Sequence, residues 1–524
     1  MFLSSVFVAA SLWIGGAAAG FGLKVSGNSF IVDTNAGLVF TVDSKSGDIT
    51  SMKYNGIEAQ GTGKHSHISS GIGASCDWYQ GGNSNNYLVI TCTTDTLVQY
   101  YVGRYNDPAI HMYTYTTAEP SIGELRFIAR INKTNLPNGY AVSEMEHGTA
   151  IEGSDVFNVN GQTHSKFYSS RQFIDDQVHG VSGKNIAAWM IMPGTAYEAS
   201  SGGPFMRDIN NQGSVDEELY FYMNSGHTQT EDFRQGGHGP YALWFTSGST
   251  PSTFDTTFWD SLPNIKGIVT QGNRGRLTGK ATGFPSADAN QLVIGWSNAN
   301  NQYWVRADSS GKYTSPYMKP GTYTMTLYRQ ELAIGTQSVT VSGGNTGTSN
   351  IASSEKTPNY IWKIGDHDGT PRGFLNADKI ETMHPSDSRM SSWGPITFTV
   401  GDSVGKFPMA IFKAVGDLTI KSTLTSSQIG ARTLEIATTL AFADGRPQVK
   451  VNNWTSKAPG APNQPSSRGV TRGTWRGNNI VYTYDIPAGT LVAGSNTITL
   501  SVISGSSGDA FLSPNVVLDS VGLY

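Results

Sequence analysis

The sequence has 524 residues, of which 38% are hydrophobic and only 15% are charged, and its formal net charge is −4. This length predicts two to four domains. The composition allows packed cores but is too polar for a membrane protein, and the weakly negative charge argues against a broad basic face for nucleic acid. The 61 glycines, the 11% aromatic content and many short alternating runs indicate an all-β, turn-rich protein.

The N-terminus has the pattern of a signal peptide. An apolar run from Phe2 to Ile14 is followed by the small residues Gly15–Ala19, which fit a cleavage site. We expect cleavage after Ala19, so that residues 1–19 are removed. The run is too short for an anchor, and no later stretch is apolar enough to span a bilayer. We therefore expect a secreted, extracellular protein without a membrane partner.

Two further features agree with an extracellular location. The cysteines are Cys76 and Cys92, which we expect to form one disulfide. In chain-entropy terms, closing a loop of this size contributes roughly 3 kcal/mol. The glycosylation sequons that begin at Asn132 and Asn453 would carry glycans if the host glycosylates.

From Phe21 to about Lys266 the chain alternates with the period of β-strands. Examples are Phe30–Thr34, Leu38–Asp43, Tyr87–Cys92 and Glu124–Ile131. Turn residues separate these runs and helix-period segments are nearly absent, which predicts stacked antiparallel sheets. We therefore place a first domain at residues 20–266.

Two further β-rich domains are predicted. Strands recur at short spacing from about Gly267 to Ser342, which suits a small β-sandwich at residues 267–344. Residues Gly343–Asn350 have no core-forming side chain and indicate a linker. The alternating runs from Thr357 to Tyr524 fit a jelly roll, the common plan of carbohydrate-binding modules, at residues 345–524.

The stretch Glu218–His227 is the first candidate for a functional site. Its apolar residues alternate with Tyr220 and Tyr222, so a core lies on one side of the strand and both tyrosines lie on the other. A Ser-Gly pair then ends the strand and leaves His227 at its edge. These residues suit a polar groove that binds sugar rings. For this segment alone, a half-buried strand with tyrosines at its wet edge is the simpler interpretation.

Two basic residues are further candidates. Lys166 lies between polar and aromatic residues, and Arg126 shares a strand face with Glu124. A lone lysine is usually a surface residue. Glu124 and Arg126 can be a plain ion pair worth under about 1 kcal/mol, or Arg126 can form a fork for a substrate carboxylate.

Carboxylates offer a competing interpretation, a glycoside hydrolase. Glu144, Glu146, Glu152 and Asp155 cluster in the sequence, but spacing along the chain cannot set the distance between two catalytic carboxyl groups. No zinc pattern, phosphate loop or GxSxG motif is present. The segment Asp366–Gly369 could bind a structural calcium ion, although a polar turn is the simpler interpretation.

The chain resembles the fungal rhamnogalacturonan lyases of polysaccharide lyase family four in eight segments, namely PSIGELRFIAR, GTAIEGSDVF, SKFYSS, FIDDQ, SSGGPF, YMNSGH, HPSDSRMSSWGP and ISGSSGDAFLSPN. The likeness runs along the whole chain in the expected order. It implies a catalytic β-sandwich of the galactose-mutarotase type, a fibronectin-type-III-like sandwich and a jelly roll similar to a carbohydrate-binding module. Two departures are Phe221, where tryptophan is expected, and the low number of cysteines.

The resemblance also implies a substrate and a reaction. The substrate is the rhamnogalacturonan I backbone of plant cell-wall pectin, and the reaction is β-elimination. The lysine of SKFYSS is Lys166, the base, and the histidine of YMNSGH is His227, also catalytic. Arg126, Tyr220 and Tyr222 line the site. The lysine base requires no cofactor, and we expect a monomer.

This reaction makes specific demands on the residues. The proton on C5 of galacturonate is poorly acidic until a cation such as Arg126 masks the neighbouring carboxylate. Lys166 can accept that proton only when it is neutral, and an ordinary lysine titrates near ~10.4, so burial or nearby cations must favour the neutral amine. His227 would protonate the leaving O4 or orient the sugar.

The third predicted domain has a basic segment that could contact the same polymer. Arg468, Arg472 and Arg476 recur every fourth residue, with Trp475 beside them. They form either a solvated basic loop or contacts to galacturonates further along the chain, so Arg468 and Arg472 are candidate substrate-binding residues. A non-catalytic protein with three sugar-binding modules is a further alternative to the lyase.

Overall fold

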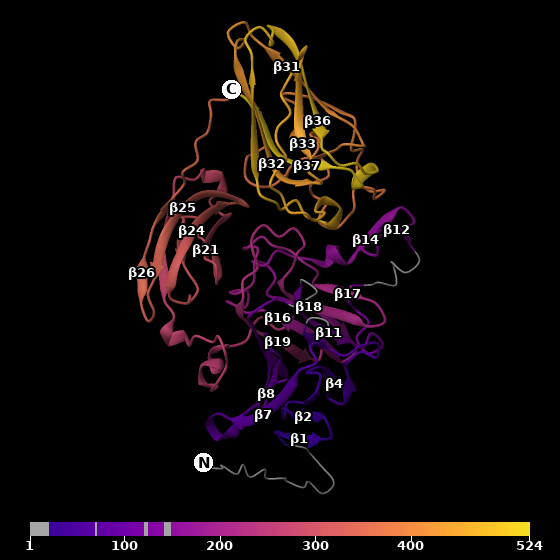
Figure 1. The fold of residues 1–524 in the computed structure, drawn as a ribbon, viewed down its shortest axis with the longest axis vertical. Helices are drawn as coiled ribbons and strands as arrows, with labels where there is room; N and C mark the ends of the chain where they lie inside the picture. The colour runs from indigo at the N-terminus through magenta and orange to yellow at the C-terminus, as the bar shows by residue number, and fades with distance from the viewer. Residues whose placement is uncertain (1–19, 69–70, 120–123, 141–147) are drawn as a thin grey trace.

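The structure is a computed structural model that describes residues 20–68, 71–119, 124–140 and 148–524. The predicted signal peptide, Glu144 and Glu146 lie outside the described residues. Apart from loops and turns, the described residues form β-strands and short 3-10 helices, which confirms the predicted all-β class. Within the described ranges, no helix has the length and apolar character needed to cross a membrane. Figure 1 shows an N-terminal part (β1–β19), a middle part (β20–β27) and a C-terminal part (β28–β37).

Within its described residues, the N-terminal part contains four antiparallel sheets. The five-stranded sheet has the order β1 (Gly22–Ser26), β2 (Ser29–Asp33), β3 (Leu38–Asp43), β4 (Ile49–Tyr54) and β5 (Ile57–Glu58). The seven-stranded sheet has the order β15 (Val178–Gly183), β16 (Ile186–Ile191), β19 (Gly236–Thr246), β10 (Ala109–Thr116), β9 (Leu97–Arg104), β8 (Tyr87–Thr93) and β7 (Ser75–Gly81). The four-stranded sheet has the order β17 (Asn211–Gly213), β18 (Glu217–Asn224), β11 (Leu125–Ile131) and β6 (His67–Ile68). The three-stranded sheet has the order β12 (Thr149–Glu152), β13 (Val156–Val159) and β14 (Gln162–Ser165).

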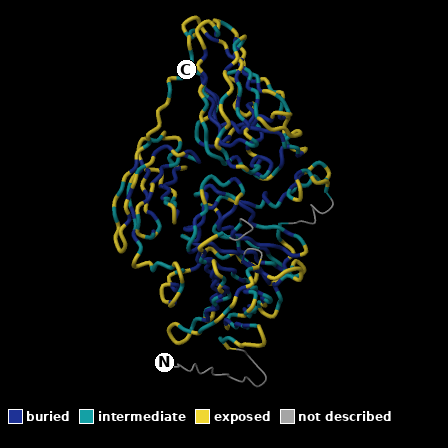
Figure 2. The backbone as a smooth tube through the Cα atoms, viewed as in Figure 1, coloured by how far each residue is buried: buried dark blue, intermediate teal, exposed yellow. Residues whose placement is uncertain are grey.

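The five-, seven- and four-stranded sheets share one apolar core, seen as the dark interior of this part in Figure 2. Alternation along the strands supplies it: Phe127 of β11 and Leu219 of β18 are wholly buried. Burying a side chain of this size contributes about 1.5–3 kcal/mol. Phe221 also faces this core, with its ring 4.7 Å from that of Tyr241. Phe221, which stands where tryptophan is expected, therefore lies in the core and does not change the opposite face of β18.

The disulfide is confirmed. Cys76 of β7 lies directly opposite Cys92 of β8 in the antiparallel register, and the two sulfur atoms are bonded at 2.10 Å. Of the two sequons, Asn453 is exposed in the turn between β33 and β34, and Asn132 is half-buried directly after β11. Glycosylation at either site stays a prediction.

The middle part is a small sandwich with its own apolar core. One sheet contains β23 (Lys312–Thr314), β20 (Arg276–Thr282), β26 (Thr346–Thr348) and β27 (Ile351–Ala352). The other contains β22 (Gln302–Arg306), β21 (Leu292–Ser297), β24 (Gly321–Arg329) and β25 (Leu332–Val341). The predicted linker Gly343–Asn350 is wrong in part, because β26 within it pairs in parallel with β20. Strand pairing uses backbone groups, so a segment without core-forming side chains can still form an edge strand.

The C-terminal part is built from two five-stranded sheets around a third apolar core. The first sheet contains β28 (Trp362–Ile364), β37 (Asn515–Leu523), β32 (Arg432–Phe442), β35 (Ile480–Ile486) and β30 (Ala410–Phe412). The second contains β29 (Ile396–Thr399), β31 (Leu418–Leu424), β36 (Gly494–Ile503), β33 (Arg446–Val451) and β34 (Trp454–Thr455). The last strand, β37, lies in the first sheet.

One buried carboxyl group joins all three parts. Glu331, in the turn between β24 and β25, accepts hydrogen bonds from Gln172 Nε2 at 2.8 Å and from Trp475 Nε1 at 3.3 Å. The backbone N–H of Glu331 also donates to the carbonyl of Asp368 at 3.0 Å. Burial raises the pKa of Glu331 to about 7, so the folded protein holds the proton more tightly than the unfolded chain does.

We expect this proton to make the stability of the junction depend on pH. The stabilisation is fully present below the unfolded pKa near 4.5 and is lost as the pH rises through about 7. Glu331→Gln keeps an acceptor for both donors and removes the titration. Scanning calorimetry should therefore show the variant more stable than the parent at pH 8, by roughly 1–3 kcal/mol, and no more stable at pH 4. The same pH dependence in both proteins would contradict this assignment.

Candidate active site

The candidate site is built on the face of β11 and β18 that points away from the core. The antiparallel register sets Arg126 opposite Tyr222 and Arg130 opposite Glu218. Side chains alternate across a strand, so the residues that lie between the core-facing ones of β11 and β18 face this side. Two strands that are distant in the sequence thereby bring charged and aromatic groups onto one surface.

This surface forms the floor of a cavity of about 460 Å³. Five residues that the sequence predicted lie in its wall: Arg126, Lys166, Tyr220, Tyr222 and His227. Glu124, Arg130, Asp216, Glu218 and Lys64 also line it. The structure therefore brings together both predicted catalytic residues and three of the five predicted substrate-binding residues.

A second cavity of about 550 Å³ adjoins the first and shares Lys64, Arg126 and Arg130 with it. His65 and His67 also line it. Burial and then the charges of Arg130, Lys64 and Arg126 lower the pKa of His67 to about 4. Lys64, Arg126 and Arg130 give the second cavity an excess of positive charge over its one carboxylate, Asp48, which suits an anionic ligand.

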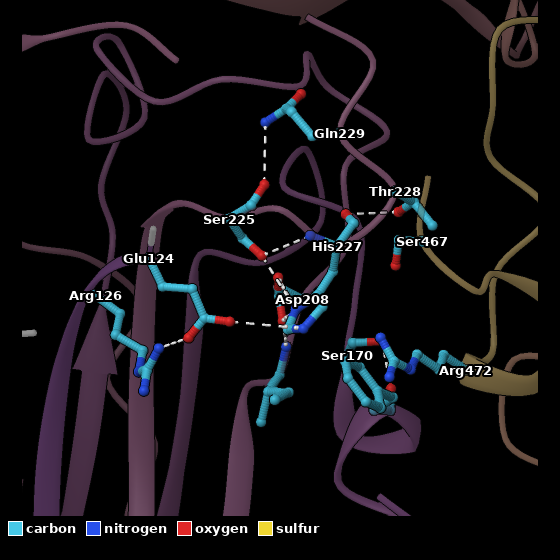
Figure 3. Close-up of polar contacts among 12 residues, drawn as sticks. Glu124, Arg126, Ser170, Asp208, Ser225, His227, Thr228, Gln229, Ser467 and Arg472 are labelled. Atoms are coloured by element: carbon cyan, nitrogen blue, oxygen red, sulfur yellow. Dashed lines mark hydrogen bonds and ion pairs between the residues drawn. The ribbon is translucent and has the colours of Figure 1, made fainter. Parts of the chain in front are cut away.

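Arg126 belongs to a row of alternating charges along the cavity (Figure 3). Its guanidinium pairs with Oε2 of Glu124 and lies 5.5 Å from the ring centroid of Tyr222. The other carboxylate oxygen of Glu124 is 3.6 Å from Nε2 of His227. Glu124 therefore connects the predicted carboxylate-binding arginine to the predicted catalytic histidine.

His227 is held from its other side by Asp208. Nδ1 of His227 is 3.1 Å from Oδ2 of Asp208 and 3.1 Å from Oγ of Ser225. Burial raises the pKa of Asp208, but the nearby His227 and hydrogen bonds outweigh burial and lower it overall. Asp208 is thus a buried carboxylate that holds the His227 ring through Nδ1.

Replacing Asp208 is expected to impair catalysis without unfolding the protein. Asp208→Asn removes the negative charge from Nδ1, so we expect kcat to fall by roughly 10²-fold or more, as for loss of an acid–base group. Steady-state kinetics with circular dichroism would measure this. Asp232→Asn, at an exposed acid nearby, is the matched control. Equal kcat values in both variants would exclude a positioning role for Asp208.

Lys166 reaches the cavity from a short turn. It is the first residue of η3 (Lys166–Ser169), whose N-cap Ser165 accepts the Phe167 N–H at 3.3 Å. Phe167 and Tyr168 are buried against Tyr220 and Tyr222 and anchor the turn. The side chain of Lys166 is 25% exposed, and its Nζ lies 2.9 Å from Oδ1 of Asp155.

Tyr220 and Tyr222 are stacked 5.5 Å apart at the floor. Tyr220 donates a hydrogen bond to Glu218. Burial raises the pKa of both phenols, that of Tyr222 well above its ordinary value. Both residues therefore keep their O–H groups at neutral pH and can act as hydrogen-bond donors.

Arg468 and Arg472 do not line either cavity. Nε of Arg468 lies 3.3 Å, and Nε of Arg472 3.2 Å, from Oε1 of Glu152, while Nη2 of Arg472 lies 3.0 Å from Oδ2 of Asp155. These contacts join the C-terminal part to the β12–β13 turn. They also occupy the described members of the predicted hydrolase cluster, and neither Glu152 nor Asp155 is among the residues that line the two cavities.

Asp208 and Arg130 were missed by sequence reasoning. Arg130 had a usable signal, because it lies four positions after Arg126 on the same strand and therefore on the same face. Asp208 had none, because it lies in a loop and reaches His227 only through the fold.

The predicted calcium segment forms a turn. Asp368 accepts hydrogen bonds from the N–H and Oγ1 of Thr370 at 2.9 and 2.7 Å. In the part of the chain that the structure describes, no group of three or more His, Cys, Asp or Glu side chains is arranged to hold a metal ion.

Comparison with known families places each part of the chain. A profile described as "Rhamnogalacturonan lyase B, N-terminal" matches residues 21–267. Profiles for domains II and III of polysaccharide lyase family 4 match residues 273–349 and 360–523.

Curated relatives match over nearly the full length. The chain is 56% identical to a probable rhamnogalacturonate lyase A of Aspergillus terreus, covering 98% of this chain and 97% of the relative. It is 54% identical to rhamnogalacturonate lyase A of Aspergillus aculeatus, covering 97% and 96%. It is also 54% identical to that of Emericella nidulans, covering all of both chains.

Proposed function

The chain belongs to the rhamnogalacturonan lyases of polysaccharide lyase family 4, and from this premise we propose that it cleaves rhamnogalacturonan I by β-elimination. The bond cleaved joins rhamnose to O4 of a galacturonate. The observation that supports this most is the meeting of Lys166, Arg126 and His227 in one cavity. The positively charged second cavity beside it suits a polymer in which every second sugar carries a carboxylate.

Arg126 masks the substrate charge. The galacturonate carboxylate binds the guanidinium, exchanging with Glu124, and a tyrosine O–H at the floor supplies a second donor. Negative charge that moves from C5 onto the carboxylate in the transition state is then stabilised where it forms. The C5 proton becomes acidic enough for an amine to remove.

Lys166 and His227 move the protons. The neutral amine of Lys166 takes the C5 proton and becomes an ammonium group. The electrons of the C5–H bond form the C4=C5 double bond, the C4–O4 bond breaks, and O4 leaves with its electron pair. His227, held between Asp208 and Glu124, gives O4 a proton. No step is assigned to a cofactor, and structural calcium at Asp366–Gly369 stays a prediction.

This scheme predicts the product. Cleavage should leave an unsaturated galacturonate at the new non-reducing end, because elimination adds no water. Ultraviolet absorbance should therefore rise in proportion to the new reducing ends when the protein acts on rhamnogalacturonan I. Reducing ends without this chromophore would mean hydrolysis, and neither signal would mean a non-catalytic sugar-binding protein.

We also propose that the protein is secreted after loss of residues 1–19 and acts as a monomer on plant cell-wall pectin. The three domains are taken as residues 20–266, 267–344 and 345–524, with the short edge strands up to Ala352 still pairing with the middle sandwich. The disulfide and the exposed sequon at Asn453 agree with an extracellular location.

A further inference from the structure

A network of ion pairs connects the C-terminal part to Lys166. Asp155, in the turn between β12 and β13, is its centre. One oxygen of Asp155 is 2.9 Å from Nζ of Lys166, and the other is 3.0 Å from Nη2 of Arg472. The carboxylate is therefore divided between an amine of the N-terminal part and a guanidinium of the C-terminal part.

Arg472 is fixed in this position by several contacts. It is the last residue of η8 (Val470–Arg472), and the carbonyl of the preceding Thr471 accepts a hydrogen bond from Tyr168 at 3.2 Å. Its Nε binds Glu152 at 3.2 Å, and its guanidinium lies 5.0 Å from the ring centroid of Phe167. Phe167 and Tyr168, the two residues that follow Lys166, therefore both contact the segment that ends in Arg472.

The sharing of the Asp155 carboxylate between Lys166 and Arg472 affects how strongly it stabilises the charged form of the proposed base, Lys166. A carboxylate with an amine as its sole partner stabilises the ammonium form, which cannot accept a proton. A guanidinium that binds the same carboxylate weakens this effect, and its own charge also disfavours a second cation nearby.

We propose that Arg472 is a positioning residue: by holding Asp155 from the C-terminal part, it allows the Lys166 amine to be neutral and to turn toward the substrate. This inference rests on the proposed function of Lys166 as the base. It gives the C-terminal part a role in the chemical step that is separate from sugar binding.

Other charged and titratable groups surround Lys166 and form a constant background in the test. They are Glu152 from β12, Arg468 from the C-terminal part, Glu124 directly before β11, Arg126 from β11, Tyr222 from β18, and His227. Burial is the main cause of the raised pKa of Tyr222. The charges of Asp208 and, to a smaller extent, Asp155 raise this pKa further, while Arg126 lowers it. These groups therefore lie within electrostatic reach of one another.

The test compares pH–rate profiles of kcat, followed by product absorbance at saturating oligosaccharide, with circular dichroism to check folding. Arg472→Gln should move the rising limb of the pH–rate profile to higher pH by about one unit. At a pH on this limb, kcat should be about tenfold lower than in the parent. Asp155→Asn should move the limb to lower pH. In the Asp155→Asn background, Arg472→Gln should have little further effect. Arg468→Gln, which loses the contacts to Glu152 and to the ring of Phe442 but none to Asp155, should leave the position of the limb unchanged.

Three results would overturn the inference: a uniform fall in kcat at every pH in Arg472→Gln, a change in KM alone, or a limb that moves as far with Arg468→Gln. If Arg472→Gln does not fold, Asp155→Asn decides alone, and an unmoved limb would reject the proposal. Lys166→Ala separates the two claims. If that variant is inactive while the Arg472 and Asp155 profiles are unmoved, only this inference fails, whereas an active Lys166→Ala variant defeats the proposed base itself.

Discussion

Lys166→Ala is expected to lower kcat by at least ~10³-fold while the fold is retained. The side chain lies in the cavity wall, where Lys64 is the one other lysine among the described lining residues. The turn that carries Lys166 is anchored by Phe167 and Tyr168 and not by the amine. Removing Nζ therefore deletes the proposed base and leaves the packing in place. Product absorbance and circular dichroism measure the two effects separately.

Two controls make the result specific. Lys184→Ala removes an exposed lysine in the turn between β15 and β16 and should have normal activity. A small primary amine such as ethylamine, added to Lys166→Ala, should restore part of the rate by replacing the missing base. Near-normal turnover by Lys166→Ala without added amine would exclude Lys166 as the base.

Arg126→Met is expected to have the second-largest effect, a fall in kcat of roughly 10²–10³-fold. The guanidinium lies beside Tyr222 and between the two cavities, and it is the cation proposed to mask the galacturonate carboxylate. Without it the C5 proton stays poorly acidic even when sugar and base are in place. Steady-state kinetics on rhamnogalacturonan oligosaccharides would measure kcat and KM.

The charge-conserving variant identifies the mechanism. Arg126→Lys keeps a cation but loses the planar fork, so its kcat should lie between those of Arg126→Met and the parent. A higher KM with unchanged kcat in Arg126→Met would contradict the proposal, because it would mean that Arg126 binds substrate and transition state equally.

Much of the site floor could be predicted from the sequence because strand alternation is a local property. The period of two places Tyr220 and Tyr222 on one face of β18 and Arg126 on one face of β11. The pairing of Arg126 with Tyr222 could not be predicted, because register between strands so distant in sequence depends on the whole sheet. Lys166 lies on a turn, so no periodicity showed that it would meet them.

The basic segment of the C-terminal part shows where local patterns stop being informative. The spacing of Arg468 and Arg472 predicted either a solvated basic loop or contacts to galacturonates, and it gave no sign of partners within the protein. Their partners in the structure are Glu152 and Asp155, more than three hundred positions away. Only the packing of the two parts brings these opposite charges together.

The most direct test of the central claim is a crystal structure of Lys166→Ala with a rhamnogalacturonan I oligosaccharide bound across the cavity. The lysine side chain is then placed on residue 166 of that structure, either in its present position or rotated away from Asp155. Its Nζ should lie about 3–3.5 Å from C5 of a galacturonate. The carboxylate of that sugar should bind Arg126, and its O4 should face His227. A sugar whose C5 faces away from residue 166, or whose carboxylate does not contact Arg126, would contradict the account.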